Sequence, residues 1–200
     1  MARSTVELRP AAPADAAAVA DVFTESCLHA YRNVLPPAVL ARFVPDVQTA
    51  RWTAHLRSLP TDHRITAAWQ GNRIIGFVEA RHPWPAAGPP SAEPARPDGT
   101  REGEVTYLFV HPGHFATGIG TRLLNAAEEW LAQAGYGSAV LWVFSDNAPA
   151  RGFYERSGWA YTGIEQYDPA LEKEGHHVRE RLHRKALAAP PGPPHATPPS

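Results

Sequence analysis

The 200-residue chain is poor in cysteine and methionine, has no long hydrophobic run and carries almost no net charge. Its one cysteine, Cys27, can form neither an internal disulfide nor a cysteine zinc site, which favours a reducing compartment. No stretch approaches the ~18 apolar residues of a membrane span, and the apolar residues 16–20 are broken up by nearby proline and aspartate, unlike a signal peptide. A net charge of −1 gives no reason to expect nucleic-acid or membrane-surface binding. We expect a cytoplasmic protein.

Proline is the abundant exception, with 21 residues gathered mainly in two places. One cluster lies within residues 82–103 and the other forms the end of the chain, residues 189–200. Proline lacks a backbone donor for helices and sheets, and such segments bury little apolar surface. We therefore predict one domain over residues 4–188, interrupted by a Pro-rich loop at 82–103 and followed by a disordered tail.

Hydrophobic periodicity divides the domain into interleaved strands and helices. Gly71 and Asn72 between two strand-like runs indicate a two-residue hairpin. The interleaving predicts an α/β or α+β fold around one mixed sheet. Strands are expected at residues 5–9, 64–70, 73–81, 104–110, 138–144, 159–162 and 178–182, and helices at 15–31, 36–43, 46–59, 118–134 and 147–157.

A glycine-containing turn between the strongest strand, 104–110, and the following helix is a candidate anion site. Gly118 and Gly120 allow close approach of a ligand to the backbone, and the first N–H groups of a helix lack internal partners. Together with the helix dipole they suit a phosphate or pyrophosphate. The turn is not a Walker loop, because no Gly-Lys-Ser/Thr follows it, and it lacks the third glycine of a dinucleotide fingerprint.

Two motifs in this region carry a resemblance. The run Val110-x-Pro112 followed by Gly118-Ile119-Gly120-x-x-Leu123-Leu124 resembles the acyl-CoA pyrophosphate loop of the GNAT family of N-acetyltransferases. The run Asn147-x-x-Ala150-x-x-Phe153-Tyr154-Glu155-x-x-Gly158-Trp159 resembles the second motif of that family, in the family's order. The resemblance implies a single domain with a mixed, mostly antiparallel sheet that is flanked by helices and splayed at its central strands.

The same resemblance implies acetyl-CoA as cosubstrate. In this family a backbone N–H near the end of the central strand, here Phe109 or Val110, holds the carbonyl oxygen, and Asn147 corresponds to a residue that bonds the pantetheine arm, although it is equally suited to capping a helix. The loop departs from the family pattern at Phe115 and Ala116, where Arg or Gln and a glycine are usual, so weaker or altered coenzyme binding is expected. The implied coenzyme residues are Phe109, Val110, Phe115, Ala116, Thr117, Gly118, Ile119, Gly120, Thr121 and Asn147, with His114 or Arg122 as further sources of positive charge.

Acetyl transfer to an amine requires a base and an acid, because an alkylammonium with a pKa near ~10 must lose its proton. Glu104 stands where the family often has its general base, and Tyr154 matches its proton donor to the departing sulfur. Both residues also have plainer interpretations, a solvated strand-end charge and a core aromatic. His82, Glu102 and His111 are rival bases on neighbouring segments.

The acceptor pocket is expected to come from the first helices and the 82–103 loop, with Tyr31 and Trp84 as its candidate residues. Arg32, His82 and Glu93 lie on the same segments, and their charges single out no acceptor. We therefore predict an N-acetyltransferase acting on a small-molecule or peptide amine, without a metal, and able to form a homodimer. The alternative is a non-catalytic acyl-CoA-binding or regulatory domain on the same scaffold.

Overall fold

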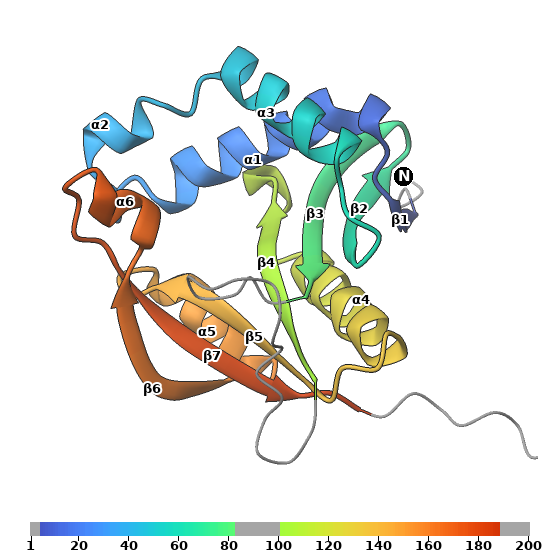
Figure 1. Cartoon of the computed structure of the whole chain (residues 1–200). Coiled ribbons are helices and arrows are strands. Elements are labelled where there is room, and N and C mark those ends of the chain that lie inside the picture. The colour runs from blue at the N-terminus through green and yellow to red at the C-terminus, as the bar shows by residue number, and fades with distance from the viewer. Residues whose placement is uncertain (1–4, 83–100, 189–200) are drawn as a thin grey trace, which may run out of the picture.

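The computed structural model describes residues 5–82 and 101–188. Seven strands form one sheet in the order β1-β2-β3-β4-β5-β7-β6 (Figure 1). Neighbouring strands are antiparallel except for β4 and β5, which run parallel. The strands are β1 (Val6–Pro10), β2 (His63–Gln70), β3 (Arg73–Arg81), β4 (Glu102–Val110), β5 (Ser138–Phe144), β6 (Ala160–Tyr167) and β7 (Arg179–Ala186).

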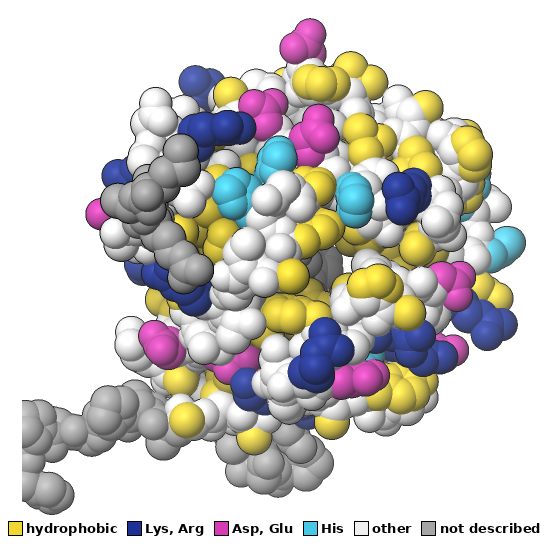
Figure 2. All heavy atoms as spheres, turned by 180° about the vertical axis from the view of Figure 1, so that it is seen from behind, with side chains coloured by type: hydrophobic (Ala, Val, Ile, Leu, Met, Phe, Trp, Pro, Cys, Tyr) yellow, Lys and Arg dark blue, Asp and Glu magenta, His cyan; other side chains and the backbone are white. Residues whose placement is uncertain are grey.

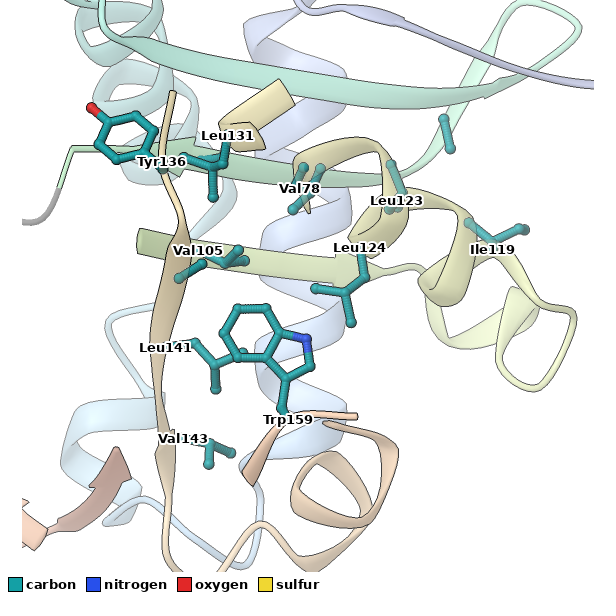
Figure 3. Packing of buried hydrophobic residues seen from close by; sticks show 14 of the residues in the cluster. Val78, Val105, Ile119, Leu123, Leu124, Leu131, Tyr136, Leu141, Val143 and Trp159 are labelled. Atoms are coloured by element: carbon teal, nitrogen blue, oxygen red, sulfur yellow. The ribbon is translucent and has the colours of Figure 1, made fainter. Parts of the chain in front are cut away.

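Helices cover both faces of the sheet. On one face α1 and α3 enclose a cluster that includes Phe23, Trp52 and Phe77, and on the other face α4 packs against β2, β3 and β4. Figure 3 shows Trp159 lying between Leu124 and Leu141 in the second cluster. The helices are α1 (Ala16–Ala30), α2 (Pro37–Leu40), α3 (Pro45–Arg57), α4 (Ile119–Gln133), α5 (Ala148–Arg156) and α6 (Pro169–Lys173).

The position of α4 follows from its apolar stripe. Leu123, Leu124 and Leu131 are all fully buried against the sheet, and each such side chain contributes about 1.5–3 kcal/mol. A Cβ atom on Gly103 of β4 would lie 2.5 Å from a methyl carbon of Leu131. A side chain at position 103 would therefore force Leu131 to move from its present packing between α4 and the start of β4.

The two parallel strands separate soon after they meet. Their ladder contains three pairs, Glu102 with Ser138, Gly103 with Ala139 and Glu104 with Val140. Beyond Glu104, β4 remains paired with β3 and β5 remains paired with β7, so the sheet opens between Val105–Val110 and the second half of β5. This confirms the predicted mixed sheet with splayed central strands.

Some boundaries differ from the sequence-based expectation. β4 begins at Glu102, inside the segment assigned to the Pro-rich loop, because Glu102 and Gly103 pair with β5. β6 extends to Tyr167, and α6 was not predicted. β6 is an edge strand with mostly exposed side chains, so it lacks the apolar alternation on which the prediction depended. The remainder of the predicted loop, residues 83–100, and the tail lie outside the described residues.

Candidate active site

The opening between β4 and β5 is the centre of the candidate site. Seen from behind, the molecule is hollowed near its middle, in the position of this opening, and hydrophobic side chains border the hollow (Figure 2). Phe153 and Tyr154 of α5 and Val110 of β4 pack at the edge of the same apolar cluster. A partly apolar passage between two strands suits an extended, flexible ligand arm.

The backbone of β4 presents specific groups to this opening. The His111 N–H donates to the Ile75 carbonyl of the neighbouring chain segment at 2.9 Å, and Phe109 lies opposite Phe77 in the antiparallel register. Because hydrogen-bonded and non-hydrogen-bonded pairs alternate, the peptide groups of Phe109 face β3 and those of Val110 face the opening. Of the two predicted N–H donors, the register therefore favours Val110.

The turn before α4 has the geometry of an anion site. Gly118 caps α4 with a φ of 84°, which is accessible to glycine without strain. The N–H groups of Ile119, Gly120 and Thr121 follow in the first helical turn and have no intrahelical acceptors. Gly120 tolerates a Cβ atom, which would make ordinary contacts of 3.5 Å with the Phe153 ring.

The residues that depart from the family pattern stand beside this turn. Ala116 has a φ of 58° and is the one non-glycine residue with a positive φ among those described. It thus keeps the left-handed conformation that glycine adopts more readily. Phe115 is 44% exposed, and its ring meets that of His29 edge-on at 5.2 Å.

Two histidines and an arginine stand near the turn. The His111 and His114 rings lie 5.9 Å apart, and the His111 Nδ1 atom accepts a hydrogen bond from the Gly113 N–H at 3.1 Å. Burial lowers the pKa of His114, and the charges of His111 and Arg73 lower it further. Arg122 is directed elsewhere, because its guanidinium donates to the Val6 carbonyl at 2.8 Å.

Tyr154 and Asn147 come from α5. Burial raises the pKa of the Tyr154 phenol, so the hydroxyl is protonated at neutral pH and able to donate. The Tyr154 ring packs against Phe153 at 5.2 Å and Trp159 at 6.4 Å. Asn147 caps α5, and its Oδ1 atom accepts from the Ala150 N–H at 3.3 Å. Its side-chain amide nitrogen is not used by this cap.

Tyr31 lies across the opening on the side of α1. Its ring is 6.4 Å from Phe109 of β4 and 5.1 Å from Phe144 of β5, so it contacts both separating strands. Burial raises the pKa of Tyr31 well above its ordinary value, and Cys27 and Tyr154 add to the shift. The structure thus brings Tyr31 and Tyr154 into one electrostatic environment.

Glu104 lies at the last paired position between β4 and β5. Its Oε2 atom accepts a hydrogen bond from the Arg81 Nε at 3.1 Å, and both side chains are largely buried. Among its rivals, Glu102 accepts two bonds from Arg184 at 2.7 and 3.2 Å. His82 lies near the Tyr136 hydroxyl at 3.4 Å. Glu104 therefore lies at the closed end of the opening, and its carboxylate is paired with Arg81.

A family comparison decides what this arrangement is. The model of the acetyltransferase (GNAT) family matches residues 28–159. The chain belongs to the GNAT family. The match contains both motifs, the separating strands and α5, so the resemblance seen in the sequence is confirmed.

Two curated proteins named mycothiol acetyltransferase also match part of the chain. A mycothiol acetyltransferase of Geodermatophilus obscurus is 31% identical over 98 residues, which are 49% of this chain and 29% of that protein. Its counterpart from Clavibacter sepedonicus is 34% identical over 64 residues, 32% of this chain and 21% of that protein. The chain therefore matches less than a third of the length of these curated relatives.

Solved GNAT structures align over almost the whole chain. The PaiA N-acetyltransferase of Thermoplasma acidophilum, in complex with coenzyme A, has a TM-score of 0.66 and 18% identity, and covers 92% of this chain and 99% of its own. YncA of Salmonella typhimurium, a putative acetyltransferase with acetyl-CoA, has a TM-score of 0.63 and 18% identity, and covers 96% and 100%. At this identity the likeness shows the GNAT fold.

Two residues predicted near the GNAT site lie outside what the structure describes, and one buried carboxylate was not anticipated from the sequence. Trp84 and Glu93 fall in residues 83–100, outside the described part. Glu180 of β7 was not predicted. It is 8% exposed, accepts a hydrogen bond from Gln166 at 2.6 Å, and lies opposite Phe144. Its alternation with the more exposed Arg179 and Arg181 is the sequence signal that could have indicated an inward position.

No group of three or more histidine, cysteine, aspartate or glutamate side chains in residues 5–82 and 101–188 is arranged to hold a metal ion. Within the same residues, no helix combines the length and apolar character needed to cross a membrane.

Proposed function

We propose that this protein is an acetyl-CoA-dependent N-acetyltransferase that acts on a primary amine of a small molecule or peptide. The observation that carries the proposal is the opening between β4 and β5, with the unsatisfied N–H groups of α4 near one end and the protonated Tyr154 phenol beside it. These residues fit a ligand with a pyrophosphate, a slender arm and a thioester. The single, buried Cys27 accords with a reducing, cytoplasmic setting.

Acetyl-CoA supplies an activated acetyl group as a thioester. The first turn of α4 binds the pyrophosphate through backbone N–H groups and the helix dipole. The Val110 N–H, which faces the opening, donates to the carbonyl oxygen as negative charge develops there. Asn147 has a side-chain N–H₂ available for the pantetheine arm.

Glu104 and Tyr154 handle the protons. Glu104 accepts a proton from the acceptor ammonium, through water, while Arg81 fixes its carboxylate in position. The amine nitrogen then attacks the thioester carbon, a C–N bond forms and the C–S bond breaks. Tyr154 donates its proton to the departing thiolate, and the second proton that the nitrogen loses on becoming an amide passes through water to restore the phenol. The products are therefore an acetamide and a free thiol.

The departures at Phe115 and Ala116 favour the second candidate, a non-catalytic acyl-CoA-binding domain. Against it, the chain keeps Glu104 and Tyr154, a base and an acid that a pure binding domain does not need. Ala116 also retains a positive φ, which preserves the course of the backbone at the missing glycine. The remaining contacts come from backbone N–H groups, which do not depend on side-chain identity. The names of the two mycothiol acetyltransferases refer to the acceptor of those proteins and do not identify the acceptor of this one.

The decisive experiment is calorimetric titration of acetyl-CoA into the wild-type protein and a Thr121→Asp variant. An aspartate in the first turn stabilises a helix but repels a bound pyrophosphate, so the variant should fold normally and bind at least about tenfold more weakly. Thr121→Asn, which is uncharged, serves as the matched control. Binding that is undetectable in the wild type, or unchanged by Thr121→Asp, would exclude the proposed coenzyme site. Thiol release with a panel of amines then tests transfer itself.

A further inference from the structure

A second cavity lies at the end of the sheet where β5 finishes and β7 begins. It has a volume of about 1000 Å³ and is bordered by the α1–α2 connection, the start of α5 and the segment between α6 and β7. We call it the arginine cleft. Its charged lining residues are Arg32, Arg151, Arg179, Arg181, Asp146 and Glu165, with His176 and His177 beside them.

Positive charge exceeds negative charge in the arginine cleft, because four arginines face two carboxylates. Glu165 compensates part of this excess. Its Oε1 atom accepts from the Arg181 Nε at 2.8 Å, and its Oε2 atom lies 4.0 Å from Arg179. Within residues 5–82 and 101–188, no carboxylate is within ion-pairing distance of Arg32 or Arg151. Two guanidinium groups thus remain uncompensated.

Two buried polar atoms in the arginine cleft also lack hydrogen-bond partners among the described residues. They are the Oγ atom of Ser145 and the Nε atom of Arg151. Buried donors are nearly always paired, because leaving one unpaired forfeits its hydration without replacement. The Arg151 Nε–H is a donor and the Ser145 hydroxyl is able to donate, so an acceptor in the cleft would satisfy both groups.

Residues that line the arginine cleft are close neighbours in the sequence of residues in the candidate active site. Arg32 follows Tyr31 and Ser145 follows Phe144, and the two aromatic rings are in contact at 5.1 Å. Arg151 precedes Tyr154 by nearly one turn of α5. A molecule whose amine reaches the β4–β5 opening beside Tyr31 could therefore extend another part into the arginine cleft.

We propose that the arginine cleft binds an oxyanion, carboxylate or phosphate, carried by the amine acceptor. The inference rests on the proposed acetyltransferase function and narrows its substrate class to amines that bear an anionic group. Arg32 and Arg151 supply charge, and the Arg151 Nε–H and Ser145 hydroxyl donate to the oxygen atoms. Arginine suits this role because its planar fork matches carboxylate and phosphate oxygens.

The first test does not depend on turnover. The Nε–H resonance of Arg151 is followed by NMR while inorganic phosphate, or separately acetate, is titrated into the protein with saturating coenzyme A, which occupies the other anion site. A saturable shift that is lost in Ser145→Ala and Arg32→Gln supports the arginine cleft as an oxyanion site. The exposed Arg57→Gln variant is the matched control and should retain the shift. A resonance that does not move with either anion overturns the proposal.

The group that the arginine cleft binds could instead be a phosphate of the coenzyme. The same resonance is therefore compared in coenzyme A and in dephospho-coenzyme A, which lacks the 3′-phosphate. If the Arg151 resonance differs between the two complexes before any free anion is added, the 3′-phosphate of the coenzyme lies in the arginine cleft. This result would overturn the assignment of the cleft to the acceptor. Equal spectra with the two coenzymes leave the cleft available and support the assignment.

A second test measures the acceptor preference directly. The dissociation constants of 2-aminoethyl phosphate and ethanolamine, and of an amino acid and its methyl ester, are measured in the presence of coenzyme A. The anionic member of each pair should bind about tenfold or more tightly. This preference should disappear in Arg32→Gln and Arg151→Gln, weaken in Arg151→Lys and persist in Arg57→Gln. Equal affinity within both pairs overturns the proposal, while failure of acetyl-CoA itself to bind would instead reject the enzyme function.

Discussion

The hydroxyl of Ser26, in α1, donates a 2.8 Å hydrogen bond to the carbonyl of Val110, the last residue of β4. Ser26 is buried, and the bond joins a helix to a strand whose side toward β5 is unpaired at this point. The side chain therefore holds the end of β4 in place and, with it, the Val110 N–H that faces the opening.

Replacing Ser26 with alanine should affect both stability and transfer. The change leaves a carbonyl without its donor, which costs about 1–2 kcal/mol in the free energy of unfolding. It also loosens the peptide that carries the Val110 N–H, so kcat should fall by more than KM changes. Urea denaturation and thiol-release kinetics measure the two effects. Ser58→Ala, which removes an exposed bond within one helix end, should be nearly silent, and unchanged kcat in Ser26→Ala would contradict the role of Val110.

Replacing Tyr154 with phenylalanine separates the enzyme from the pure binding domain. Loss of a proton donor should reduce kcat by about 10²–10⁴-fold, while the affinity for acetyl-CoA stays the same because the ring and its packing are kept. Calorimetry and thiol release give the two values. The exposed Tyr161→Phe change should alter neither. If the Tyr154→Phe variant kept a normal kcat, Tyr154 would not be the proton donor and another group would have to supply the proton.

Coenzyme binding should raise the pKa of His114. In the free protein burial and the charges of His111 and Arg73 hold this pKa below its ordinary value. A pyrophosphate at α4 favours the protonated ring, so binding should take up protons and affinity should rise as the pH falls through the pKa of the complex. NMR titration of the His114 ring, with and without coenzyme A, measures the shift. His114→Gln should flatten this pH dependence, and an unchanged pKa would place the pyrophosphate elsewhere.

Glu180 should make the protein less stable as the pH rises. Burial raises its pKa to about 7, with Asp168 and Glu104 adding to the shift and the Gln166 hydrogen bond opposing it, whereas the unfolded value is about 4.3. The native state therefore holds the proton more tightly, and stability falls between about pH 4 and 7 by at most about 4 kcal/mol before levelling off. Glu180→Gln should remove this slope in urea titrations at several pH values. The exposed Glu129→Gln variant should keep it.

Replacing Ala116 with glycine should be harmless or stabilising. The alanine bears a φ of 58°, and relief of its left-handed strain outweighs the greater freedom of glycine in the unfolded chain. Stability should stay equal or rise by up to about 1 kcal/mol, with acetyl-CoA affinity retained. Ala116→Val should lower both. As a control, Ala126→Gly within α4 should cost about 1 kcal/mol, and a similar loss in Ala116→Gly would show that this backbone is unstrained.

Local patterns were sufficient for the elements and the coenzyme turn. The strand predicted at residues 73–81 and that at 138–144 have the same bounds as β3 and β5, because each is rich in β-branched and aromatic residues and lies between turn residues. Gly118 could be assigned to the coenzyme turn from the sequence, because a helix start and a positive φ depend on only a few neighbouring residues. The same is true of the Asn147 cap, whose acceptor and donor are three residues apart.

Contacts between distant segments could not be predicted in this way. The sequence by itself determined the mixed fold, the family and the glycine turn, and it predicts Glu104 and Tyr154 as the base and the acid, because each depends on residue types at short spacing. Only the tertiary structure decided that Tyr31 lies between Phe109 and Phe144 and that arginines from three segments border one cleft. These relationships arise where the chain brings separate elements together, since burial and charge at such a point depend on every neighbour and not on local sequence.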